Sequence, residues 1–127
     1  MNVLVVESNL AARERVLAAL GESYTVRFAS GAREALAAVN EQLPDLLVTE
    51  MDLEDGDGLA LCEQVRAHPT GSRLPIMLLT SRTGIRDKVA GFQAGADDYV
   101  VKPLDTRLFY ARVRLLCRIK GLERRVS

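Results

Sequence analysis

Residues 44–59 read PDLLVTEMDLEDGDGL, and their pattern is that of one strand, loop and helix of a parallel sheet. The run Leu46–Thr49 has the length of a strand and no polar face, which is typical of a central strand covered on both sides. Pro44 precedes the run, an acidic loop follows it, and apolar residues at helical spacing begin at Leu59.

The same alternation extends in both directions along the chain. Besides Leu46–Thr49, the predicted strands are Val3–Val6, Thr25–Phe28, Ile76–Leu79 and Tyr99–Val101, and the predicted helices are Ala11–Leu20, Ala32–Val39, Leu59–Ala67, Ile85–Ala94 and Leu108 onward. Short connections between parallel strands require right-handed crossovers, so the sequence predicts a doubly wound α/β fold. Gly21, Gly71 and Gly95 can end helices, and Asp105 can cap the last one.

The length and composition indicate one compact domain whose net charge favours no class of partner. The chain has 127 residues, 48% hydrophobic and 27% charged, and its 17 basic and 17 acidic residues give a formal net charge of +0. No global field therefore favours nucleic acid, membrane or acidic substrates. Cys62 and Cys117 lack metal-binding spacing, and we expect both to be buried free thiols. No apolar run approaches the ~20 residues that span a bilayer, and we expect a cytoplasmic location.

Polar side chains follow four of the five predicted strands. They are Glu7 and Ser8, Glu50, Thr80 and Ser81, and Lys102 with Pro103. Exposure at strand ends is enough to explain Ser8 or Ser81 alone. Ligand sites in such sheets lie at the carboxyl ends of the strands, and two carboxylates, a hydroxyl and a lysine there suggest a phosphate- or cation-handling site or its remnant.

Four segments in order resemble the response-regulator receiver domain (CheY-like) over about residues 2–118. They are VLVVES (3–8), PDLLVTEMDLEDGDGL (44–59), PIMLLTSR (75–82) and GADDYVVKPL (95–104). The resemblance implies a flavodoxin-like (βα)5 sandwich of three layers with sheet order 2-1-3-4-5. It also implies an acidic pair that binds magnesium, an aspartate that accepts phosphate from a histidine kinase, a hydroxyl and a lysine that contact the phosphoryl group, and a switch aromatic residue.

By this resemblance, Thr80 and Tyr99 match the switch residues, and Lys102 with Pro103 matches a Lys-Pro pair whose peptide bond is expected to be cis. Asp57 and Gly58 match the end of the loop after the third strand. The departures are elsewhere: Glu7 takes the first acidic position, but Ser8 replaces the second acid and Glu50 replaces the phosphoacceptor aspartate.

These departures predict an atypical receiver that lacks the phosphoacceptor. Ser8 removes a charged ligand, so magnesium binding should be lost or weak and no cofactor is expected. Glu50 carries its carboxylate about one bond too far for in-line attack. We therefore expect a phosphorylation-independent signalling module rather than an enzyme. The alternative is a weakly active receiver that takes phosphate at Glu50 or Asp52 with Mg²⁺.

Two hypotheses describe the signalling state of a receiver with such a pocket. Glu50 paired with Lys102 mimics a phosphoaspartate and holds Thr80 and Tyr99 in an active-like arrangement, or the pocket is inert and the domain is a scaffold. Tyr99 turned inward with Thr80 drawn toward Glu50 would support the first.

Three features have simpler interpretations. Asp52, Glu54, Asp55 and Asp57 are read as a solvated acidic loop rather than a substitute site. His68 is read as a surface residue. A nucleotide-binding flavodoxin-like protein is disfavoured, because residues 7–10 (ESNL) lack the glycines that admit a phosphate.

The expected partner surface is the face of the helix at 85–94, the strand at 99–101 and the last helix. Its charges are Lys88, Asp97, Asp98, Arg112 and Arg118. They permit a homodimer, or they form intramolecular pairs worth under ~1 kcal/mol each. The last helix, Thr106 to about Val126, either ends solvated or leads through a linker at 119–127 to an output domain. A protein partner or that domain is expected on this face, without direct nucleic-acid or membrane contact.

Overall fold

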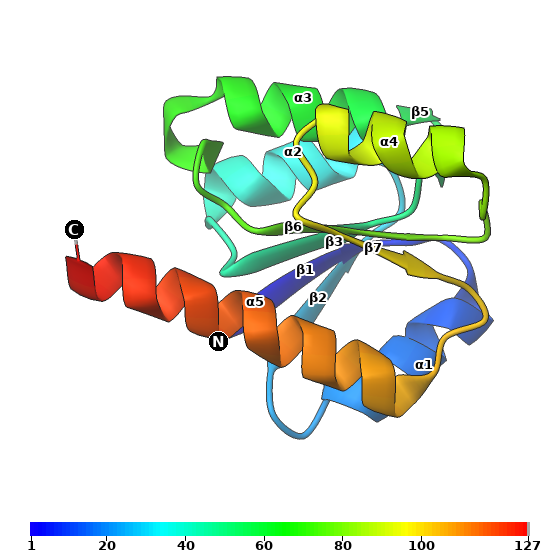
Figure 1. The fold of residues 1–127 in the computed structure, drawn as a ribbon, viewed down its shortest axis with the longest axis horizontal. Coiled ribbons are helices and arrows are strands. Elements are labelled where there is room, and N and C mark those ends of the chain that lie inside the picture. The colour runs from blue at the N-terminus through cyan, green and yellow to red at the C-terminus, as the bar shows by residue number, and fades with distance from the viewer. Residues whose placement is uncertain (127) are drawn as a thin grey trace.

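The computed structural model describes residues 1–126, with side chains described through Ile119. A five-stranded parallel sheet lies between two layers of helices (Figure 1). Its strands are β1 (Asn2–Val6), β2 (Thr25–Ala29), β3 (Leu46–Thr49), β6 (Ile76–Thr80) and β7 (Asp98–Val101). They are ordered β2-β1-β3-β6-β7, so the predicted order 2-1-3-4-5 is confirmed.

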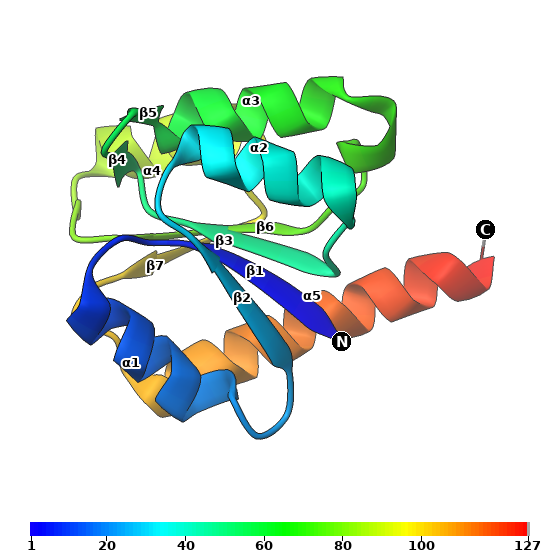
Figure 2. The ribbon, with the colours of Figure 1, turned by 180° about the vertical axis from the view of Figure 1, so that it is seen from behind.

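Two helices cover one face of the sheet and three cover the other (Figure 2). The first pair is α1 (Leu10–Leu20) and α5 (Thr106–Val126), and the second set is α2 (Ala32–Glu41), α3 (Gly58–Ala67) and α4 (Ile85–Gln93). Alternate residues of β1 serve the two faces: Val3 and Val5 pack with α1 and α5, whereas Leu4 and Val6 pack with α2 and α3. The three-layer α/β sandwich is therefore as predicted.

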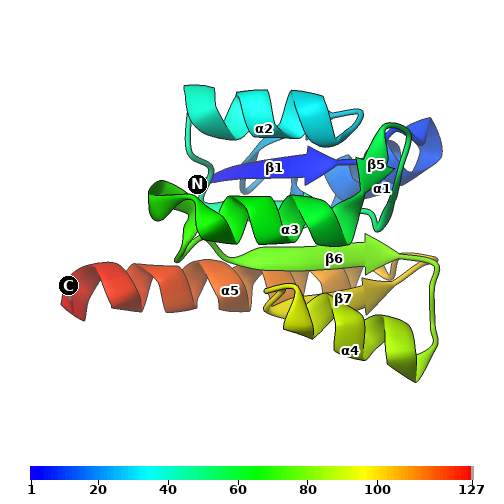
Figure 3. The same ribbon diagram turned by 90° about the horizontal axis from the view of Figure 1, so that it is seen from above.

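The strands end at a common edge of the sheet, which Figure 3 shows for β1, β6 and β7. This edge carries a small element that the sequence pattern did not indicate, an antiparallel pair formed by β4 (Asp52–Leu53) and β5 (Gly56–Asp57). The pair directly follows β3 and therefore borders the candidate site.

The acidic loop after β3 does more than face solvent. Asp55 accepts hydrogen bonds from the backbone N–H groups of Ala32 (2.7 Å) and Arg33 (3.1 Å) at the start of α2. These bonds hold the pKa of Asp55 below its ordinary value. Asp57 accepts from the N–H of Leu59 (2.8 Å) and caps α3. Both carboxylates thus stabilise helix N-termini.

Three of the four predicted helix boundaries have the expected residues. Gly21 ends α1, Gly95 follows α4 with a φ of 113°, and Asp105 accepts hydrogen bonds from the first turn of α5. Gly71 ends a different helix from α3. Helix α3 ends at Ala67, the predicted residue, because His68 precedes a proline and is held extended, and Gly71 closes the separate 3₁₀ turn η1 (Pro69–Gly71).

Helix α5 is the longest element, with 21 residues, and it continues through Gly121. Its buried side chains, from Phe109 to Cys117, pack on the sheet. The linker predicted at 119–127 falls almost entirely outside the residues whose side chains are described. Cys62 and Cys117 are buried and form no disulfide, as predicted. Among residues 1–126, no helix has the length and hydropathy needed to cross a membrane.

Candidate functional site

Lys102 lies at the centre of a polar cluster at the carboxyl edge of the sheet. Its Nζ is 2.9 Å from Oε2 of Glu7 and 2.9 Å from Oε2 of Glu50. The two carboxylates follow β1 and β3, and the lysine follows β7, so side chains from three strands meet here. The side chains of Glu7, Glu50 and Lys102 are 5%, 11% and 23% exposed. One cation thus compensates two nearly buried anions.

The pKa of Lys102 reflects this environment. Burial by itself would lower that pKa, but hydrogen bonds to Glu50 and Glu7 and their negative charges outweigh burial and raise it above the ordinary value. The ammonium group therefore stays charged throughout the neutral range. The peptide bond from Lys102 to Pro103 is cis, as expected.

The second carboxylate oxygen of Glu50 turns back on its own backbone. Oε1 accepts hydrogen bonds from the N–H groups of Met51 (2.8 Å) and Asp52 (3.3 Å). The extra methylene of glutamate gives the side chain the reach to do this while Oε2 meets Lys102. Gly58 lies against the same backbone, where a Cβ would collide with the carbonyl oxygen of Glu50. Both carboxylate oxygens of Glu50 are therefore engaged.

Thr80 and Tyr99 share Arg82 as a hydrogen-bond partner. Tyr99 is 6% exposed, and its hydroxyl donates a 2.8 Å hydrogen bond to the carbonyl oxygen of Arg82 and contacts Sδ of Met51 at 3.4 Å. The buried Thr80 accepts from the backbone N–H of Arg82 at 3.3 Å. No hydrogen bond joins Thr80 to Glu50 in the part of the chain that the structure describes. Tyr99 thus has the inward position of the active-like hypothesis, whereas the expected approach of Thr80 to Glu50 is not seen.

The donor set does not fit magnesium. Ser8 is exposed, and its side chain bonds no residue that the structure describes. The two carboxylates of Glu7 and Glu50 already share the ammonium group of Lys102. Within residues 1–119, whose side chains are described, no group of three or more His, Cys, Asp or Glu side chains is arranged to hold a metal ion.

Sequence reasoning missed an ion pair beside the pocket. Arg82 holds Asp52 with two contacts, Nη2 to Oδ1 at 2.6 Å and Nε to Oδ2 at 3.0 Å. This pairing keeps the pKa of Asp52 below its ordinary value. The signal was present, because each residue follows the end of one of two adjacent parallel strands, β3 and β6, by two or three positions.

The charges predicted for a partner face are largely used within the fold. Arg112 contacts Asp98 at 3.2 Å and donates to the carbonyl oxygen of Tyr99 at 3.1 Å. Lys88 is half-buried on α4 and Arg118 is exposed on α5, and neither forms an ion pair with a described residue.

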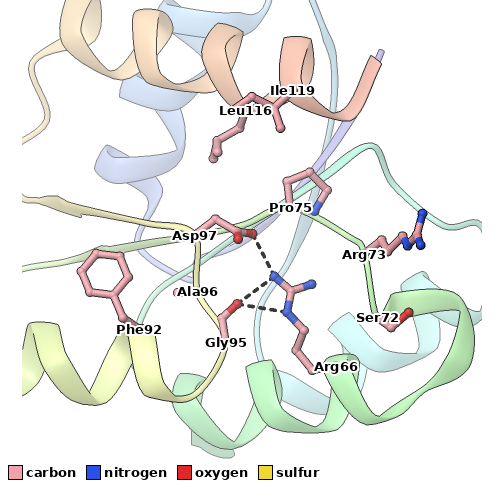
Figure 4. Close-up of a pocket in the computed structure, with 10 residues that line it drawn as sticks. All are labelled: Arg66, Ser72, Arg73, Pro75, Phe92, Gly95, Ala96, Asp97, Leu116 and Ile119. Atoms are coloured by element: carbon pink, nitrogen blue, oxygen red, sulfur yellow. Dashed lines mark hydrogen bonds and ion pairs between the residues drawn. The ribbon is translucent and has the colours of Figure 1, made fainter. Parts of the chain in front are cut away.

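Asp97, the fifth of these charges, lines a cavity of about 580 Å³ at the amino-terminal edge of the sheet. It contacts Arg66 at 2.8 Å, and Figure 4 shows the guanidinium between Asp97 and Gly95. Arg66 also donates to the carbonyl oxygens of Gly71 and Leu74. These groups occupy the guanidinium, so it is not free to bind an anion in the cavity, and Glu50 does not line the cavity.

Comparisons with known proteins agree with the fold. Residues 3–114 match the response regulator receiver domain. Response regulator MprA of Mycobacterium ulcerans (strain Agy99) is 40% identical over 124 residues, which are 97% of this chain and 53% of MprA. The chain spans about half the length of the curated relatives that it matches.

Solved structures give the same result. A putative response regulator from Chloroflexus aurantiacus J-10-fl is 37% identical with a TM-score of 0.88, over 92% of this chain and 97% of that one. NtrX from Brucella abortus, in complex with ADP, is 28% identical with a TM-score of 0.89, over 99% of this chain and 29% of NtrX. The sheet order agrees with a receiver domain, and the match of residues 3–114 identifies it as one. The chain belongs to the response regulator receiver domain family of two-component signalling.

Proposed function

We propose that this receiver domain signals without accepting phosphate, and that Glu50 paired with Lys102 takes the permanent place of a phosphorylated side chain. One observation carries the proposal: both carboxylate oxygens of Glu50 are engaged, one with Lys102 and one with the backbone of residues 51 and 52. Attack on a phosphoryl donor needs a carboxylate oxygen free to line up with phosphorus. Glu50 would have to break a nearly buried ion pair to supply one.

The competing function is phosphate acceptance at Glu50 or Asp52 with Mg²⁺. Asp52 is the more accessible of the two, with a side chain that is 59% exposed. Its two oxygens are held by Arg82, and the neighbouring position 8 supplies a neutral hydroxyl rather than a carboxylate. Neither candidate combines a free oxygen with the anionic ligands that magnesium prefers.

The test is phosphorylation by acetyl phosphate with Mg²⁺, read by intact mass. We expect the wild type to gain no phosphoryl group beyond the background of the Glu50→Gln and Asp52→Asn variants. A stoichiometric adduct in the wild type would contradict the proposal, and its loss in one of the two variants would identify the acceptor.

We further propose that the face of α4, β7 and α5 contacts a protein partner, an output domain or a second copy of the chain. Exposed apolar side chains gather on its two helices: Ile85, Val89 and Phe92 on α4, and Leu108, Leu115 and Ile119 on α5. The two helices flank the edge strand β7 on opposite sides (Figure 1). Exposed apolar side chains that gather into a contiguous surface mark protein contacts, which is why we assign the partner to this face.

A charge introduced on α4 tests whether a second copy of the chain binds this face. If the domain self-associates through this face, Val89→Lys should raise the dissociation constant about tenfold or more, because an unpaired charge would be buried. Leu17→Lys, at a similarly exposed position on α1, is the control and should leave it unchanged. Light scattering over a concentration series measures both, and a wild type that stays monomeric throughout would exclude the homodimer.

A further inference from the structure

We infer that the ion pair between Arg82 and Asp52 is a latch that positions Tyr99 and the start of α4, a task that a phosphoryl group performs in a phosphorylated receiver. The inference deepens the proposed function and rests on it. It assigns Arg82 as a positioning residue, which acts through Tyr99 and the loop before α4.

The latch joins two elements that are otherwise separate. The guanidinium of Arg82 grips Asp52 with two parallel contacts of 2.6 and 3.0 Å, the bidentate geometry that makes such pairs strong and directional. Its third nitrogen, Nη1, lies 3.5 Å from Oδ1 of Asp87 in the first turn of α4. One side chain therefore connects the β4–β5 hairpin after β3 with the helix after β6.

The loop before α4 has little else to hold it. Residues 81–84 are all exposed, and every hydrogen bond that this loop makes with a described side chain involves Arg82. The backbone N–H of Arg82 donates to Thr80, and its carbonyl oxygen accepts from the hydroxyl of Tyr99. The position of Arg82 therefore determines where the Tyr99 hydroxyl finds its acceptor.

The same contacts lead back to Glu50. The backbone N–H of Asp52 donates to Oε1 of Glu50 at 3.3 Å, so the carboxylate of Glu50 fixes the backbone that presents Asp52 to Arg82. A continuous set of contacts thus runs from Glu50 through Asp52 and Arg82 to Tyr99. Glu50 forms no hydrogen bond with Thr80 among the described residues, but it can influence the switch tyrosine by this route.

The position of Tyr99 and the position of α4 depend on each other. At Gly91 of α4 a Cβ would lie 2.6 Å from Cδ1 of Leu78 and 3.3 Å from the ring of Tyr99. The helix therefore packs directly on the inward ring, with no room for rearrangement of one without the other. Holding Arg82 holds both.

The latch should shift the ratio of the inward and outward positions of Tyr99 rather than lock one of them. The side chains of Arg82 and Asp52 are 47% and 59% exposed. An exposed ion pair of ordinary strength changes the ratio of two states by up to about fivefold, and salt screens it. A partner or a change in ionic strength can therefore shift Tyr99 without any covalent change in the domain.

Methionine-methyl NMR can read the position of Tyr99. The chain has three methionines, of which Met51 touches the Tyr99 hydroxyl, while the buried Met77 is an internal reference. In Arg82→Gln we expect the ratio of inward to outward Tyr99, measured by its contact with the Met51 methyl group, to fall about fivefold. Exchanging the charges with Asp52→Arg and Arg82→Asp together should restore most of that ratio.

The matched control is Arg86→Gln, which removes the same charge from the first turn of α4. Arg86 is exposed and forms no ion pair with a described residue, so Tyr99 should not move. An Arg82→Gln variant that keeps the wild-type contact between Met51 and Tyr99 would overturn the latch.

Titrating the unmodified protein to ~1 M salt tests the latch without any variant, and an unchanged contact there would also overturn it. Intact-mass phosphorylation of the same samples keeps the two ideas apart. A phosphoadduct would refute the proposed function, whereas an immobile Tyr99 would refute only the latch.

Discussion

Replacing Ser8→Asp and Glu50→Asp together should convert the domain into one that gains a single phosphoryl group from acetyl phosphate and Mg²⁺. The first change would add a third carboxylate beside Glu7 and position 50, giving magnesium the anionic oxygens that it prefers. The second would shorten the side chain by one methylene and withdraw its carboxylate from the contacts with Lys102 and the backbone. Misplacing a reacting group by about 1 Å can cost on the order of 100-fold in rate, so we expect a gain of at least that size.

The two single variants make this prediction sharp. Ser8→Asp alone should bind magnesium more tightly without accepting phosphate, and Glu50→Asp alone should accept it slowly. Intact mass gives the adduct for all four proteins, and calorimetry gives their magnesium affinities. An adduct of equal yield in the wild type, or none in the double variant, would contradict the role proposed for these two positions.

Lys102→Met should cost about 3 kcal/mol of the free energy of unfolding at neutral pH. The change keeps an unbranched side chain that is one atom shorter, but it leaves Glu7 and Glu50, whose side chains are 5% and 11% exposed, without their shared cation. Breaking a buried pair by removing one partner is costly because a buried charge then remains uncompensated. Urea unfolding of wild type and variant at pH 7 gives the difference.

Two comparisons separate this cause from a loss of packing. Adding Glu50→Gln to Lys102→Met should recover about half of the loss, since one of the two uncompensated charges disappears. Lys88→Met, at a half-buried lysine without an ion pair among the described residues, should stay within about 0.5 kcal/mol of the wild type. A double variant that is no more stable than Lys102→Met alone would contradict the charge explanation.

The free energy of unfolding of the wild type should fall at strongly alkaline pH, where Lys102 loses its charge. Because the pKa of Lys102 is raised in the folded state, its contribution is fully present below the ordinary value of 10.5. That contribution is lost only as the pH rises through the raised value.

The sequence was sufficient for the sheet because each strand is a short apolar run between turn signals. Runs such as Val3–Val6 are buried on both faces, which only a central parallel strand requires. The rule that sites lie at the carboxyl ends of strands then placed Glu7, Glu50 and Lys102 at one edge, where the structure brings them into contact.

Side-chain partners were harder to predict than positions. Asp97 and Asp98 looked alike as surface acids, yet one binds Arg66 of α3 and the other Arg112 of α5. Which arginine an exposed carboxylate meets depends on rotamers and on helix placement over a few Å. A periodic pattern of apolar residues gives information on neither the rotamers nor the exact placement of the helices. The same limit hid the pairing of Asp52 with Arg82, which required knowing how the loops after β3 and β6 turn.

The two buried cysteines make this domain convenient for site-directed labelling. Burial raises the pKa of the Cys62 thiol to about 12, so at neutral pH only on the order of one molecule in 100,000 carries the reactive thiolate there. Cys117 is also buried, at 4% exposure. A single cysteine introduced by Thr83→Cys in the exposed loop beside Arg82 would therefore be the fast-reacting thiol. A fluorophore or spin label attached to it would follow the movement of that loop in real time.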